Sequence, residues 1–119
     1  MDTNTVIITG RLTRDPDFRS TATGAAVVDF TIASGDGDRT YFGAVTAWNG
    51  PANFIRQNCR KGSWVLVQGK LSREEWRDRN GDRQAKTRIV AFSVELLRPA
   101  AGDVPQAQDR GHQEDLWNE

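Results

Sequence analysis

Apolar residues occupy every second position along much of the chain up to residue 98, which is the pattern of half-buried β-strands. Val28, Phe30 and Ile32 show it most clearly, because a carboxylate residue and a hydroxyl residue stand between them. Strands are therefore predicted over residues 5–12, 26–34, 41–48, 63–76 and 85–97. Phe18 is expected to continue the first strand beyond a bend at Asp15-Pro16.

One segment departs from the strand pattern. Asn49-Gly50-Pro51 interrupts the third strand and opens a predicted helix, with Pro51 suited to its first turn and the apolar positions within residues 52–60. Gly62 is expected to end this helix. A helix this short is stable only when it packs on the sheet. Asn80-Gly81 predicts a hairpin of the type I′ class between the last two strands. Three strands, a helix and a two-strand hairpin, in that order, indicate an all-β OB-fold, a five-stranded Greek-key barrel.

Phe42 and Trp48 stand on the same face of the third predicted strand, since side chains alternate between faces. The small residues Ala44 and Thr46 separate the two rings on that face. Such a pair forms a platform on which nucleobases can stack. Two rings that fill a core would produce the same pattern, and from this segment alone the core is the commoner outcome.

Trp76 is a third aromatic residue of interest, because the chain around it is polar and close to the predicted hairpin. The basic residues near it are Arg73, Arg77, Arg79, Arg83, Lys86 and Arg88. A base stacked on the indole, with its phosphates held by these cations, would suit this arrangement. Glu74 and Glu75 oppose a phosphate track at this point. The alternative is a ring that covers the root of the hairpin among solvated charges.

Two further pairs are candidate surface sites. Arg11 and Arg14 end the first strand and could meet phosphates, although solvated surface residues would look the same. Trp64 and Leu66 share the strand face opposite Val65, so one of the two faces must point away from the core. An outward Trp and Leu would mark an oligomer interface. Burial under the helix is the alternative.

Charge is divided unevenly along the 119 residues. Residues 1–98 carry 15 Lys/Arg and 11 Asp/Glu, whereas residues 99–119 carry one Arg and five acids. We expect one domain over residues 1–98 and a disordered acidic tail over residues 99–119, where the apolar alternation ends. A basic body of this kind suits a polyanionic ligand.

Catalysis and cofactors find no support in the sequence. Cys59 is the only cysteine and His112, in the tail, the only histidine, so neither a disulfide nor a His- or Cys-based catalytic or metal site can be built. There is no glycine-rich phosphate loop. Nothing resembles a signal peptide or a membrane span, so we expect a cytoplasmic, nucleoid-associated protein without a membrane partner.

Several segments together resemble the bacterial single-stranded DNA-binding proteins. They are residues 6–16, 26–33 and 60–71, together with Trp76 followed by Asn80-Gly81, within a similarity that covers residues 4–97. The resemblance implies an OB-fold, usually as a homotetramer, that binds single-stranded DNA with little sequence preference. It places the family's stacking positions on Phe42, Trp48 and Trp76, and its basic pair on Arg60-Lys61.

The chain departs from the family pattern at three places. The connection over residues 35–39 is short, and Glu74 and Glu75 occupy a stretch that is usually basic. Family members also recruit replication and repair proteins through an acidic tip that ends in phenylalanine. The corresponding anchor here would be Asp115, Leu116 and Trp117, without a terminal aromatic carboxylate.

The sequence thus predicts a non-enzymatic binder of single-stranded DNA that acts in replication, recombination and repair as a homo-oligomer, a tetramer or else a dimer. Stacking is assigned to the three rings. Phosphate contacts are assigned to Arg11, Arg14, Arg60, Lys61, Arg73, Arg77, Arg79, Arg83 and Lys86. One alternative is an OB-fold protein-interaction module with incidental nucleic-acid binding. Another is an RNA-binding OB domain.

Overall fold

Six strands and one helix follow one another in the computed structural model, which describes residues 2–100. The elements are β1 (Val6–Leu12), β2 (Asp17–Ser20), β3 (Ala26–Asp36), β4 (Arg39–Trp48), α1 (Asn49–Asn58), β5 (Trp64–Arg77) and β6 (Arg83–Arg98). All five predicted strands are present, and Phe18 lies in β2, a short separate strand after the bend at Asp15-Pro16.

The strands form one sheet in the order β1-β5-β6-β4-β3-β2, which closes into a ring because β1 also pairs with β3. All neighbours are antiparallel except β4 and β6, which run parallel. The closing contact is short, joining Arg11 to Ala33 and Leu12 to Ile32. This closed, mostly antiparallel barrel with a single helix between β4 and β5 confirms the predicted OB-fold.

Gly10 permits the closing contact. A Cβ atom at this position would lie 2.8 Å from the carbonyl oxygen of Ala33 and 3.2 Å from the Cβ of Ile32. Any larger residue would therefore push β1 away from β3 at the point where the ring closes.

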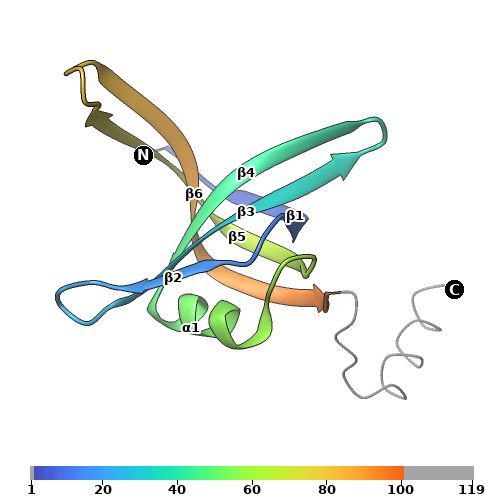
Figure 1. Ribbon diagram of the computed structural model, residues 1–119. Helices are drawn as coiled ribbons and strands as arrows, with labels where there is room; N and C mark the ends of the chain where they lie inside the picture. Colours follow the sequence, from blue (N-terminus) through green and yellow to red (C-terminus); the bar gives the residue numbers. More distant parts are fainter. Residues whose placement is uncertain (1, 101–119) are drawn as a thin grey trace, which may run out of the picture.

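The core lies inside the ring and is formed by the inward-facing residues of each strand. Val28, Phe30 and Ile32, which displayed the alternation in the sequence, are all buried there. Helix α1 covers one end of the barrel and adds the buried residues Ala52 and Ile55 to the same cluster (Figure 1). Cys59, just after the helix, joins it too, and burial raises the pKa of its thiol to about 11.

The helix begins at the predicted strand break but ends earlier than predicted. It begins at Asn49, which adopts a left-handed φ of 53° that turns the chain directly from β4 into the helix. It ends at Asn58, where the Cys59 amide still donates to the carbonyl of Ile55. Gly62, at a φ of 91°, serves the next loop instead, where its amide donates to the carbonyl of Leu12.

Two hairpins, β3–β4 and β5–β6, extend from the barrel as arms that diverge from each other (Figure 1). The turn of the second arm is not of the predicted type I′. That type needs positive φ at both central residues, and only Gly81 has it. The carboxylate of Asp78 instead accepts hydrogen bonds from the amides of Asn80 and Asp82, and the Gly81 amide donates to the Asp78 carbonyl.

Strand β6 ends at Arg98, at the boundary proposed for the folded domain, although Ala100 is still buried beside Gly62. The division at residue 98 stays a prediction. The proposed anchor residues Asp115, Leu116 and Trp117 lie outside the described residues. Within residues 2–100, no helix has the length and apolar character to cross a membrane. The same residues contain no cluster of three or more potential metal ligands.

Candidate nucleic-acid interface

The two rings of β4 lie on the outside of the barrel. Phe42 is 63% exposed and Trp48 is 44% exposed, whereas the alternate residues Gly43, Val45 and Ala47 are buried. The strand therefore presents its two rings to solvent and Gly43, Val45 and Ala47 to the core. Six residues of extended chain place the rings about 20 Å apart.

Trp76 belongs to the same outer surface. Thr46, which lies between the two β4 rings, is the ladder partner of Val90 in β6. In β6, every second side chain from Val90 along the second arm to Gln84 points outward, and Gln84 is the ladder partner of Trp76. Directly paired residues point to the same side of a sheet, and Trp76 is 46% exposed. We call this continuous surface, which carries Phe42, Trp48 and Trp76, the ring face.

The same alternation divides the basic residues of the second arm. Lys86 lies on the ring face, two positions from the partner of Trp76. Arg73, Arg77 and Arg83 occupy the intervening positions and so project from the opposite face of the arm. Arg73 forms an ion pair with Glu75 at 3.4 Å, and Arg77 donates to the carbonyl of Gly81 within the turn. Arg79 lies in the turn itself.

Three other predicted phosphate contacts gather near the start of β5. The carboxylate of Asp15 accepts a hydrogen bond from the Lys61 amide at 2.8 Å, which joins the loop after β1 to the loop before β5. Arg14, Arg60 and Lys61 are exposed on these two loops. Arg14 also forms an ion pair with Asp17 at 3.6 Å.

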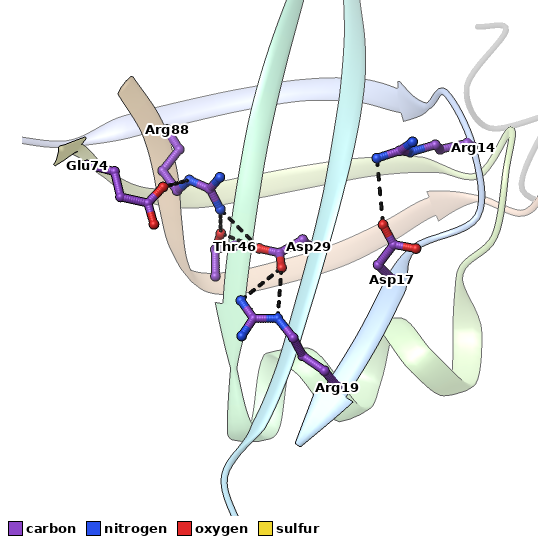
Figure 2. Close-up of polar contacts among 7 residues, drawn as sticks. All are labelled: Arg14, Asp17, Arg19, Asp29, Thr46, Glu74 and Arg88. Carbon is purple, nitrogen blue, oxygen red and sulfur yellow. Dashed lines mark hydrogen bonds and ion pairs between the residues drawn. The ribbon is translucent and has the colours of Figure 1, made fainter. Parts of the chain in front are cut away.

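Between the rings lies a polar cluster of side chains that the sequence did not predict as a unit, although Arg88 and Glu74 had been noted near Trp76. It consists of Arg19, Asp29, Thr46, Glu74 and Arg88 (Figure 2). Asp29 is at its centre and accepts from Thr46 at 2.7 Å, from Arg88 at 3.0 Å and from Arg19 at 3.0 Å. Glu74 lies 3.1 Å from the Nε of Arg88 as an ion pair, without the alignment of a hydrogen bond.

The surroundings of Asp29 act on its ionisation in two directions. Partial burial raises its pKa, but hydrogen bonds from Thr46 and Arg19 and the charges of Arg19 and Arg88 together lower it by more. The pKa of Asp29 is therefore below its usual value of 3.8. The position of this carboxylate in the middle of β3, on the outward side of the alternation, was a sign in the sequence that it has polar partners.

The polar cluster has two consequences for the ring face. It links side chains from β2, β3, β4, β5 and β6, and so fixes the second arm relative to the β4 rings. Its two carboxylates also match its two guanidinium groups, which leaves the centre of the ring face without net charge. Cations available to a polyanion lie around this centre and not at it.

Replacing Asp29 with asparagine should lower the free energy of unfolding at pH 7 by about 1.5–2 kcal/mol, because charge-assisted hydrogen bonds are lost. A carboxyl with a lowered pKa stabilises the fold above its unfolded-state pKa and loses that effect as pH falls through the folded-state pKa. The difference in the free energy of unfolding between the wild type and Asp29→Asn should therefore be constant from pH 7 to pH 5 and shrink below about pH 4. Urea unfolding at several pH values measures it.

Asp17→Asn is the matched control for that substitution. Its ion pair with Arg14 joins two side chains that are 71% and 72% exposed, so solvent screens it and little stability should be lost. If both variants unfold at the same urea concentration as the wild type, the polar cluster does not stabilise the barrel.

Trp64 and Leu66 both point away from the core and are half-buried, while Val65 and Val67 are fully buried. Trp64 lies between two guanidinium groups, with Arg11 at 5.8 Å and Arg98 at 5.7 Å from its ring centre. Their assignment to an oligomer interface stays a prediction. The sequence analysis missed two more exposed apolar residues of this region, Ile7 in β1 and Phe92 in β6. Phe92 is the extra residue of a bulge opposite Gln68 and Gly69, which the alternation could not reveal.

Comparison with known proteins agrees with this geometry. The model of the single-strand binding protein family matches residues 3–97. Single-stranded DNA-binding protein 2 of Listeria monocytogenes is 34% identical over 118 residues, which cover 92% of this chain and 73% of the relative. Single-stranded DNA-binding protein A of Bacillus subtilis is 36% identical, with 83% of this chain and 62% of the relative covered. The single-stranded DNA-binding protein of Thermus aquaticus is 39% identical, and the match covers 83% of this chain and 39% of the relative.

This chain thus spans less than two thirds of the length of the latter two relatives. The matched family is named for binding and not for a catalytic activity, and its match covers every strand from β1 to β5 and nearly all of β6. The chain therefore belongs to the single-strand binding protein family.

Proposed function

We propose that this protein binds single-stranded DNA with little sequence preference and coats it during replication, recombination and repair. The observation that carries the proposal is the exposure of Phe42, Trp48 and Trp76 on one continuous face of the barrel. Every base has a flat π-surface, so stacking on such rings is tolerant of sequence. The names of the relatives support the same ligand.

Phosphates would be held by the cations that surround the rings. Within residues 2–100, Lys86 and Arg11 are exposed and have no carboxylate within ion-pair distance. Lys86 shares the ring face with Trp76, and Arg11 is two ladder positions from Phe42 through Ala33. The remaining assigned cations, Arg14, Arg60, Lys61, Arg73, Arg77, Arg79 and Arg83, would contribute longer-range attraction.

Titration with oligo-dT should quench the intrinsic tryptophan emission, and the affinity should fall as salt rises. Each neutralised phosphate contributes about 0.7 to the slope of log K against log salt on single strands. Lys86→Gln should lower that slope by about this amount. Arg83→Gln, which removes another exposed cation, from the opposite face of the arm, should change it less.

Two outcomes would contradict the proposal. Emission that stays flat at low salt would mean that DNA does not reach the rings. Displacement of bound oligo-dT by a much lower concentration of oligo-U would instead favour an RNA-binding OB domain, which recognises the 2′-hydroxyl.

We also propose that the protein acts as a homo-oligomer, a tetramer or a dimer, in the cytoplasm. Residues Val6 to Gly10 of β1 pair only with β5, which leaves an open strand edge that a second copy could cover. Ile7 and Leu66 lie on the outward face next to this edge. Recruitment of replication or repair proteins through Asp115, Leu116 and Trp117 is part of the same proposal. The mass measured by gel filtration, compared between the wild type and the Ile7→Lys variant, tests the self-association.

A further inference from the structure

Arg88 is the member of the polar cluster whose contacts are incomplete. Its Nη1 atom donates to the carboxylate of Asp29 at 3.0 Å and to the hydroxyl of Thr46. Its Nε atom lies 3.1 Å from the carboxylate of Glu74 but donates no hydrogen bond. Within residues 2–100, this Nε is the one buried side-chain nitrogen or oxygen without a hydrogen-bond partner. A buried donor of this kind favours an acceptor that can approach it along the N–H direction.

The register of the second arm explains why Glu74 is poorly aligned. The direct ladder partner of Arg88 is Ser72, whereas Glu74 is paired with Lys86. Glu74 therefore reaches Arg88 along the diagonal of the ladder, which is longer than a direct pair. Figure 2 shows Glu74 on one side of the guanidinium group and the contacts to Thr46 and Asp29 on another. The carboxylate comes close to Nε, but its attachment to β5 keeps it out of line with the N–H bond.

Glu74 is not needed to hold Arg88 in place. Asp29 in β3 and Thr46 in β4 already orient the guanidinium group through hydrogen bonds. The side chain of Glu74 is 56% exposed, whereas that of Arg88 is 21% exposed. Ion pairs with an exposed member contribute little to stability, because solvent screens them. Glu74 can therefore leave Arg88 for solvent while the rest of the polar cluster stays intact.

The contact lies where DNA would cross the ring face. Glu74 is two residues from Trp76 on the same strand, so both side chains point to the ring face. Thr46, which Arg88 contacts, lies between the two rings of β4. A strand that stacks on Trp76 and on Trp48 therefore passes over Arg88. It meets the carboxylate of Glu74 on the way, and a carboxylate that stayed there would repel its phosphates.

Phosphate can replace this carboxylate, because guanidinium groups bind both anions through the same N–H donors. Without Glu74, the polar cluster keeps the guanidinium groups of Arg19 and Arg88 and the carboxylate of Asp29, which is a net charge of +1. Lys86, the ladder partner of Glu74, has no carboxylate within ion-pair distance in the part of the chain that the structure describes. The centre of the ring face is thus neutral with Glu74 in place and cationic once Glu74 has moved.

We propose that Arg88 is a phosphate-binding residue that Glu74 covers in the free protein. A phosphate of the strand that stacks on Trp76 displaces the Glu74 carboxylate and accepts a hydrogen bond from the Nε of Arg88. The inference rests on the proposed function. It makes Glu74 a residue that lowers the affinity for DNA by competing with phosphate for one guanidinium group.

Glu74→Gln should raise the affinity for oligo-dT about three- to fivefold at low salt, because the competing charge is removed and the side chain keeps its size. Glu75→Gln is the matched control. Glu75 is the next residue of β5 and forms an ion pair with Arg73 at 3.4 Å, but it projects from the opposite face of the arm. This control should change the affinity by less than about twofold. Fluorescence anisotropy of a labelled oligo-dT measures both variants.

A double-mutant cycle with Arg88→Gln tests whether the gain depends on Arg88. In the Arg88→Gln background, Glu74→Gln should gain no more affinity than Glu75→Gln does in the wild type, because there is no guanidinium group left to uncover. General repulsion between Glu74 and DNA would leave the gain undiminished in that background. Urea unfolding checks that Arg88→Gln is folded.

The Nε–H resonance of Arg88 gives a measurement that needs no change in the polar cluster. In a nitrogen–proton correlation spectrum of the wild type, saturating oligo-dT should shift this resonance, because a phosphate then accepts its hydrogen bond. Glu74→Gln should show the same shift at a lower concentration of oligo-dT. This measurement decides the question if Arg88→Gln does not fold.

The outcomes separate this inference from the proposed function. If neither the wild type nor Glu74→Gln binds oligo-dT, both proposals are wrong. If both proteins bind it, any one of three results overturns the Arg88 site alone. These are equal affinities of Glu74→Gln and Glu75→Gln, an undiminished gain in a folded Arg88→Gln background, and an Nε–H resonance that saturating oligo-dT leaves unshifted.

Discussion

Replacing Phe42 and Trp48 together with alanine should weaken the binding of oligo-dT by about a hundredfold. Each ring is exposed on the ring face, and loss of base stacking costs about 1–3 kcal/mol per base. Two rings at about 1.4 kcal/mol each correspond to this factor. Because both side chains are outward, the free energy of unfolding should change little. Fluorescence anisotropy of a labelled oligo-dT measures the affinity, and urea unfolding checks the fold.

Tyr41→Ala is the closest available control. Tyr41 is 53% exposed and precedes Phe42 in β4, but alternation puts it on the other face, where its ring lies against Gly43. The Tyr41→Ala variant should therefore bind oligo-dT with almost the affinity of the wild type. An equal loss for Tyr41→Ala and Phe42→Ala would mean that exposure, and not membership of the ring face, governs DNA contact.

Replacing Gly69 with alanine should lower the free energy of unfolding by roughly 2–3 kcal/mol, because overpacked positions in a core cannot relax fully. Gly69 is buried in β5, opposite the bulge of β6 that Phe92 creates. A Cβ atom there would run into the carbonyl oxygen of Val90 and lie 2.9 Å from the Cα of Ala91. These are backbone atoms, so no side-chain rotation can relieve the contact. Urea unfolding measures the loss.

Gly50→Ala separates this steric effect from the general effect of removing a glycine. Gly50 lies in α1, and a Cβ atom added to it would meet nothing within 4 Å. This variant should be as stable as the wild type or slightly more stable, since alanine favours the helix. If Gly69→Ala unfolds at the same urea concentration as Gly50→Ala, the bulge does not approach β5 as closely as described.

Local patterns determined the strands, because burial on one face of a barrel forces a period of two on the sequence. The same period placed Phe42 and Trp48 on one face of β4 before any coordinates, and Trp64 and Val65 on opposite faces of β5. Turn residues were less reliable. Asn80-Gly81 indicated a turn, but its type depended on the Asp78 carboxylate, which competes for the same amides.

The sequence by itself determined the order of the elements, the alternation within each strand and the family, since all three depend on residues that are neighbours along the chain. Which way each face points depended on the closure of β1 onto β3, and only the tertiary structure contains that contact. Strand pairing also decided which cations accompany the rings. The parallel pairing of β4 with β6 brought Arg88 to Asp29, 59 positions apart, and the closure of β1 onto β3 aligned Trp64 with Phe42 through Arg11 and Ala33. Pairings over such distances follow from strand register, which no local period specifies.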